Sequence, residues 1–85
     1  MARYFFHLCD GRDVIMDPDG REIDDHRKIA VLALKEARWC ISQDALDGQI
    51  DLGQSIEVRD EAGELFHLIR LAEAVTVGTS GAGGT

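Results

Sequence analysis

The sequence predicts a small two-layer α+β domain, an antiparallel sheet of two hairpins packed on one long helix, in the order β-β-α-β-β. Three observations predict this fold class. The chain opens with a short aromatic-rich segment, RYFFHLC, that ends at a turn pair. Residues 26–46 contain no Gly or Pro and carry apolar residues at helical spacing. Residues 55–59 and 64–70 then form two short segments joined by a glycine-containing loop, as in a hairpin.

The first hairpin is expected to pair residues 3–9 with residues 13–16, across a turn that starts at Asp10. The segment DPDG, residues 17–20, is a second turn. Proline presets its second position, and glycine accepts a positive φ at its fourth. Residues 21–23 are long enough for a short third strand.

The helix is expected from about residue 26 to residue 46. Asp24 or Asp25 is predicted to cap its N-terminus, and Asp47-Gly48 to stop it. Four residues at helical spacing are predicted to face the sheet: Ala30, Leu34, Ala37 and Ile41. Alanine at such positions favours a close approach of the helix to the sheet.

The residues after the second hairpin are ambiguous. Within residues 71–77, LAEAV fits a helical turn and VTV fits a strand. We assign residues 1–77 to a single α+β domain and expect residues 78–85, GTSGAGGT, to be a disordered glycine-rich tail. A chain of this length buries only about 60% of its unfolded surface, so oligomerisation would help to stabilise it.

The triplet Phe-His-Leu occurs twice, around His7 and around His67. Because side chains alternate across a strand, one face of these two strands is assigned to the core. Its members are the more apolar set: Tyr4, Phe6, Leu8, Phe66 and Leu68. Both histidines then lie on the face away from the helix, where they would be neighbours if the two strands pair.

A metal site is one interpretation of that placement. His7, Cys9 and His67 carry imidazole and thiol groups of the kind that bind zinc, and three ligands with an open position suit catalysis. The set has no recognised spacing such as CxxC or HExxH. Two amphipathic residues on a half-exposed sheet face explain the pattern more simply. We therefore assign no metal, no cofactor and no catalytic residue.

Apolar residues beside the histidines suggest a docking surface instead. Phe5, Leu65 and Ile69 are expected on the same open face, and a contiguous exposed apolar patch usually marks an interface. Charging of the two histidines at about pH 6 would then weaken the contact.

The back of the helix offers a second candidate interface. Leu32, Trp39 and Leu46 follow at seven-residue intervals and form one stripe opposite the predicted inward face. Tryptophan is enriched at binding hot spots. A rotated helix would instead place Trp39 at the edge of the core. Two such surfaces predict a homo-oligomer, with a dimer as the first expectation, and leave room for another protein as partner.

Charge and hydropathy argue against several partners. With 9 basic and 16 acidic residues the net charge is −7, which disfavours nucleic acid binding. No apolar run approaches the ~20 residues that span a bilayer, so no membrane partner is expected. No secretory signal is recognised, and Cys9 and Cys40 are expected to be reduced thiols of a cytoplasmic protein.

Three functions stay open. The first is a non-enzymatic module that acts through protein contacts and self-associates. The second is an antitoxin-like partner of a small basic protein, supported by the acidic charge. The third is a metal- or thiol-dependent enzyme that uses His7, Cys9 and His67.

Five segments carry a resemblance to known proteins: RYFFHLCDG, DPDG, REIDD, IEVRDEAGELFHL and AEAV. In this order, over about residues 3–77, they resemble a family of small bacterial proteins described only as a domain of unknown function. The resemblance implies a compact α+β domain and no established activity. The sequence is also distantly similar to HicB-type antitoxins, which place a strand meander and an acidic turn before a helix. Their PDLPGC-like segment is replaced here by IDDHRK.

Overall fold

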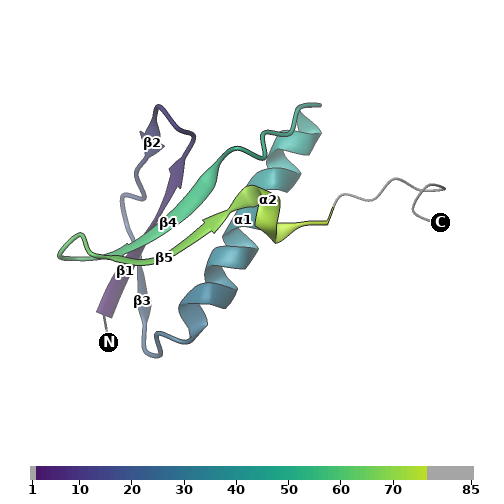
Figure 1. Cartoon of the computed structure of the whole chain (residues 1–85). Coiled ribbons are helices and arrows are strands. Elements are labelled where there is room, and N and C mark those ends of the chain that lie inside the picture. The colour runs from purple at the N-terminus through teal and green to yellow at the C-terminus, as the bar shows by residue number, and fades with distance from the viewer. Residues whose placement is uncertain (1, 77–85) are drawn as a thin grey trace.

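Within residues 2–76, which are the residues that the structure describes, one five-stranded antiparallel sheet and two helices make up the fold (Figure 1). The structure is a computed structural model. The predicted tail at 78–85 lies outside the described residues. Along the chain the elements are β1 (Ala2–Cys9), β2 (Val14–Ile15), β3 (Arg21–Ile23), α1 (Lys28–Leu46), β4 (Ser55–Asp60), β5 (Leu65–Arg70) and α2 (Leu71–Ala74). The predicted α+β class is confirmed.

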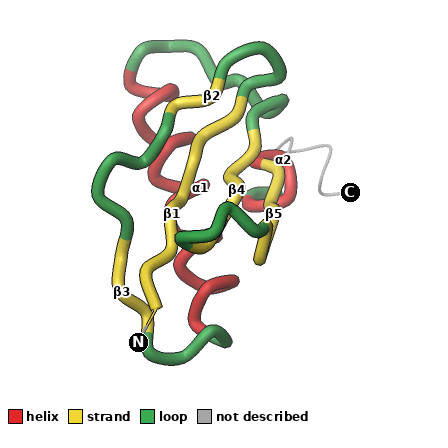
Figure 2. Tube along the Cα trace, turned by 90° about the vertical axis from the view of Figure 1, so that its left-hand side faces the viewer, coloured by secondary structure: helices red, strands yellow, loops and turns green. Residues whose placement is uncertain are grey.

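The strand order is β2-β1-β4-β5, and β3 also pairs with β1. Since β4 pairs with β1 from Tyr4 to Cys9, β2 and β3 share the opposite edge of β1. Strand β3 pairs with residues 2–4 of β1 and β2 with Leu8 and Cys9. The two short strands therefore act as one edge strand that the DPDG turn interrupts. Strand β5 forms the other edge of the sheet (Figure 2).

Helix α1 covers one face of the sheet (Figure 1). Its buried residues recur at every fourth position: Ile29, Ala33, Ala37 and Ile41. The predicted inward face is right for its second half and wrong for its first, because Ala30 is exposed and Leu34 is only partly buried. A small rotation of the helix exchanges Ala30 for the larger Ile29, which buries more apolar area.

The helix also begins later than predicted. Lys28 is its first residue, and the N-cap is Arg27, which makes no side-chain capping bond. Asp25 shapes the preceding turn instead, since its carboxylate accepts the N–H of Arg27 at 3.0 Å and its backbone C=O accepts the N–H of Lys28 at 2.9 Å.

The ambiguous segment after β5 is a helical turn. In α2, Leu71 and Ala74 are buried and extend the core between sheet and α1. Arg38 of α1 fixes this turn, because its Nε donates to the backbone C=O of Ala74 at 2.9 Å. The alternative of a strand does not hold for the described part of residues 71–77.

Strand β5 presents the opposite face from the one predicted. Val58 pairs with His67 and Ile56 with Ile69, so His67 and Ile69 share the helix-covered face with buried β4 residues. Phe66 and Leu68, predicted to be core residues, are each close to half exposed. Both faces of this strand carry apolar residues, so alternation alone cannot tell which face is buried.

A β-bulge in β5 also changes which of its side chains share a face, relative to the prediction. The pairing passes from Val58–His67 to Arg59–Leu65, which leaves Phe66 as an extra residue in β5. Its ring meets Tyr4 edge-on, with centroids 5.1 Å apart, at the border of the core. Leu65 and Leu68, opposite Arg59 and Glu57, consequently lie together on the face that α1 does not cover.

Candidate functional site

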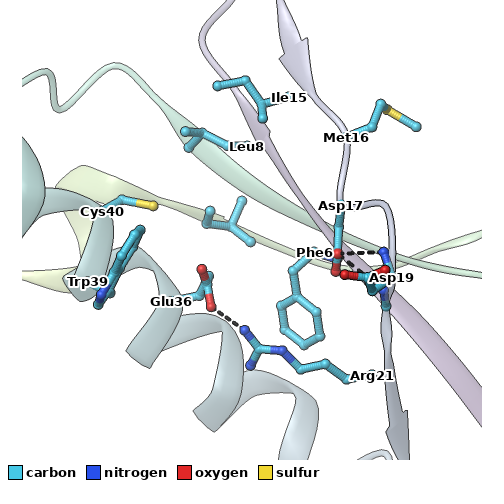
Figure 3. Close-up of a pocket in the computed structure, with 12 residues that line it drawn as sticks. Phe6, Leu8, Ile15, Met16, Asp17, Asp19, Arg21, Glu36, Trp39 and Cys40 are labelled. Carbon is cyan, nitrogen blue, oxygen red and sulfur yellow. Dashed lines mark hydrogen bonds and ion pairs between the residues drawn. The ribbon is translucent and has the colours of Figure 1, made fainter.

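A groove of ≈ 410 Å³ runs between α1 and the interrupted edge formed by β2 and β3 (Figure 3). Its walls combine apolar side chains, among them Leu8, Ile15, Trp39 and Cys40, with the charged side chains of Asp19, Arg21 and Glu36. Ile15, Met16 and Trp39 are all well exposed, at 65%, 63% and 59%. Ile15 and Trp39 lie on opposite sides of the hollow, and two large exposed apolar side chains there form a surface suited to contact with another molecule.

An ion pair bridges the groove. Arg21 of β3 pairs with Glu36 of α1, and the guanidinium also lies over the Phe6 ring at 4.7 Å from its centroid (Figure 3). Because both charged groups are partly exposed, the pair contributes modestly to stability. The position of the pair is more important, since it joins the helix to the sheet edge beside the carboxylate of Asp19.

Between β2 and β3, the Asp17 side chain takes over the hydrogen bonding of the sheet edge. Its carboxylate accepts three backbone N–H groups: Phe6 at 3.2 Å, Asp19 at 3.2 Å and Gly20 at 3.1 Å. The first of these bonds satisfies a β1 amide at the point where no strand pairs with it. Burial alone would raise the pKa of Asp17, but the N–H donors and nearby Arg21 outweigh it and hold the pKa below its usual value.

His7 fixes the same turn from the other side. Its side chain is 6% exposed, and Nδ1 accepts the backbone N–H of Asp17 at 3.0 Å. The ring lies nearly parallel to that of Phe5, with centroids 6.2 Å apart. Gly20 packs against Phe5 so closely that a Cβ there would lie 2.9 Å from Phe5 Cε2. The DPDG turn thus covers the part of β1 that was predicted to be open.

The structure does not bring His7, Cys9 and His67 together. His7 shares a face with Glu57, whereas His67 shares the opposite face with Val58, and β4 separates β1 from β5. Among residues 2–76, no group of three or more His, Cys, Asp or Glu side chains is placed to hold a metal ion. Burial, with the Glu57 carboxylate beside it, raises the pKa of the Cys9 thiol, which disfavours the reactive thiolate.

The predicted open-face patch is not contiguous either. Phe5 is partly covered by the turn, and Ile69 lies on the helix face. Strand β4 stands between β1 and β5 and contributes an ion pair to this face, Arg59 with Glu57 at 3.0 Å. Leu65 alone of the three stays exposed on it.

The predicted stripe of Leu32, Trp39 and Leu46 on α1 is also not one continuous exposed surface. Leu32 packs against the core, while Trp39 and Leu46 are exposed. Sequence reasoning missed Ile15, which lies across the groove from Trp39, and Met16, whose side chain points away from Trp39 in Figure 3. The apolar run VIM directly before the DPDG turn was a usable signal for them, because a two-residue strand cannot bury three apolar side chains in succession.

The free edge of β5 is a second candidate surface. Leu65, Phe66 and Leu68 expose 48%, 48% and 45% of their surfaces there. Among the described residues, β5 pairs only with β4. Exposed apolar edges of this kind are ready to pair with a further strand.

No helix in residues 2–76 has the length and apolar character needed to cross a membrane. Comparison with curated proteins and with solved structures finds no match for this chain. The similarity to HicB-type antitoxins stays a prediction. A family match extends over residues 3–72, from β1 into α2, and confirms the resemblance noted from the sequence motifs. The chain belongs to the family described as "Domain of unknown function (DUF6894)".

Proposed function

We propose that this domain is a non-catalytic protein-interaction module that self-associates in the cytoplasm. The observation that carries the proposal is the edge strand β5, which has three large apolar side chains each close to half exposed and, among residues 2–76, pairs with no strand other than β4. A domain of this size has a small core, so burying such a strand against another copy would add substantially to its stability.

The contrast between the two edges of the sheet supports this proposal. Natural sheets protect exposed edges with short strands, proline, bulges or charges. The β2–β3 edge has such protection: its strands are short, and Pro18 and the Asp17 bonds interrupt it. Strand β5 has six residues without proline, and its bulge leaves residues 67–70 in regular pairing. The proline-free, regularly paired residues 67–70 leave part of this edge open to a further strand, which favours pairing as its role.

The titratable groups fit a non-catalytic role. His7 uses Nδ1 in a structural hydrogen bond, and burial raises the pKa of both Cys9 and Cys40. A thiol with a raised pKa is a poor nucleophile at neutral pH. Both cysteines are free thiols, which fits the reducing cytoplasm.

Sedimentation velocity over a series of concentrations tests the proposal. We expect concentration-dependent dimer formation by the natural chain. Leu65→Ser should weaken it, whereas Trp39→Ala, a matched change on the groove, should leave it unchanged. Monomers at every concentration would contradict the proposal.

A second candidate function is binding of a small basic protein, as an antitoxin-like partner does. The groove favours it, because Trp39 shares the groove with the carboxylate of Asp19 on a chain of net charge −7. A basic partner would be captured by the natural protein at low salt and lost with Trp39→Ala. Retention by that variant would exclude the groove as its binding site.

A further inference from the structure

We propose that two copies of the chain pair their β5 strands antiparallel about a two-fold axis at Leu68, so that the two sheets become one. This inference rests on the proposed self-association and specifies its geometry. Figure 2 shows β5 at the edge of the sheet, away from the interrupted β2–β3 edge.

The backbone directions single out Leu68. The N–H of Leu71 donates to the C=O of Gln54 at 2.9 Å, toward β4. Because backbone groups alternate in direction along a strand, Ile69 and His67 also face β4, whereas Leu68 and Arg70 face outward. The N–H of Arg70 is already bound by the Glu73 carboxylate at 2.9 Å, which agrees with this direction.

Leu68 therefore offers both a donor and an acceptor at the open edge. When one residue sits on a two-fold axis between antiparallel strands, its N–H and C=O bond to the C=O and N–H of the same residue in the second copy. Such an axis requires a residue whose N–H and C=O are both unbonded, and within residues 2–76 no strand pairs with this side of Leu68. The side chains of Leu68 from the two copies would then meet on the face that α1 does not cover.

Charge complementarity identifies the occupant as a second copy in antiparallel orientation. One end of β5 adjoins the acidic loop that contains Asp60, Glu61 and Glu64, and the other end carries Arg70. Among the described residues, Arg70 takes part in no ion pair. Antiparallel pairing brings each acidic end to the Arg70 end of the other copy. Parallel pairing would place the two acidic ends together.

Site-specific disulfide formation tests this geometry. Cys9→Ser and Cys40→Ala first remove the natural thiols, and Leu68→Cys is then added to that background. Paired residues of an antiparallel ladder have Cα atoms about 5.5 Å apart, within the range that a disulfide spans. With oxidised glutathione, we expect covalent dimer from Leu68→Cys to form at least about tenfold faster than from the matched Trp39→Cys, since pairing raises the effective thiol concentration.

The outcomes separate the two proposals. Fast cross-linking of Trp39→Cys without that of Leu68→Cys would overturn the strand pairing and leave self-association standing through the groove. Faster cross-linking of Leu65→Cys than of Leu68→Cys would overturn the position of the axis. Slow cross-linking of all three, with a monomeric natural chain, would overturn both proposals.

Amide hydrogen exchange on the natural protein gives an independent measurement that needs no substitution. The Leu68 amide should exchange about tenfold or more slowly when the protein concentration is raised through the dimerisation range. The Asp19 amide, on the opposite edge and bonded within its own turn, serves as the control and should not change. Exchange at Leu68 that is independent of concentration in a dimeric sample would overturn the pairing.

Discussion

The backbone N–H of Asp17 donates a hydrogen bond to Nδ1 of His7, at 3.0 Å, across the interrupted edge of the sheet. The Asp17 carboxylate in turn accepts the N–H of Phe6, the residue before His7. Together these bonds replace the strand pairing that β1 lacks at this point. The first of the two Phe-His-Leu triplets therefore serves to hold a turn.

Replacing His7 by Phe should destabilise the fold by about 1–3 kcal/mol, because the ring is kept but the Asp17 N–H loses its acceptor in a buried place. Urea unfolding followed by circular dichroism measures this difference. A His7→Phe variant as stable as the natural protein would show that the bond contributes nothing.

Asp17→Asn should destabilise the protein at neutral pH by about 1–3 kcal/mol, since three N–H groups lose a charged acceptor. The folded state lowers the pKa of Asp17, so its stabilising effect is present above the unfolded value of about 3.9 and is lost as the pH falls through the folded value. The difference between the two proteins should therefore shrink in acid. A difference that stays constant from pH 7 down to about pH 3 would contradict this account.

Gly20→Ala should be more destabilising than Gly11→Ala. Both glycines have positive φ, at 71° and 92°, so both substitutions carry a backbone penalty of about 1 kcal/mol. Only at Gly20 would the new Cβ also collide, at 2.9 Å, with Arg3 Cγ and Phe5 Cε2, whereas Gly11 has open space. Thermal unfolding of the two variants measures the comparison, and equal losses would mean that the turn does not pack tightly on Phe5.

Leu68→Glu should weaken dimer formation at least about a hundredfold, because two like charges would meet at the two-fold axis. The fold itself should lose only about 0.2–1 kcal/mol, because the new carboxylate would be exposed but would lie opposite Glu57 on β4. Trp39→Glu is the matched control on the other surface. If Trp39→Glu abolished the dimer and Leu68→Glu did not, the interface would be the groove.

The sequence was sufficient to place the helix and strands because their signals are local. Alternation marked β4, the short glycine-containing loop after it marked β5 as the returning strand, and the absence of Gly and Pro marked α1. The inward face of α1 was harder to predict, because Ala30 and Ala33 make neighbouring faces similar. Packing against the sheet decided between them.

The faces of β5 could not be predicted because they depend on pairing with a distant strand. His67 and Leu68 belong to a strand that is apolar on both sides, and the extra residue Phe66 has no sequence signal of its own. The groove depends similarly on tertiary structure, since Trp39 and Ile15 line the same hollow only when α1 lies along the β2 edge. The DPDG turn was predicted, but its bond to His7 was not.

The most direct measurement of the central claim is the absolute mass of the natural chain in solution at neutral pH, by light scattering after gel filtration. Pairing through β5 predicts a mass about twice that of the 9.4 kDa chain. A mass of 9.4 kDa at the highest concentrations attainable would contradict it. The exposed leucines of β5 would then need a different protein to cover them.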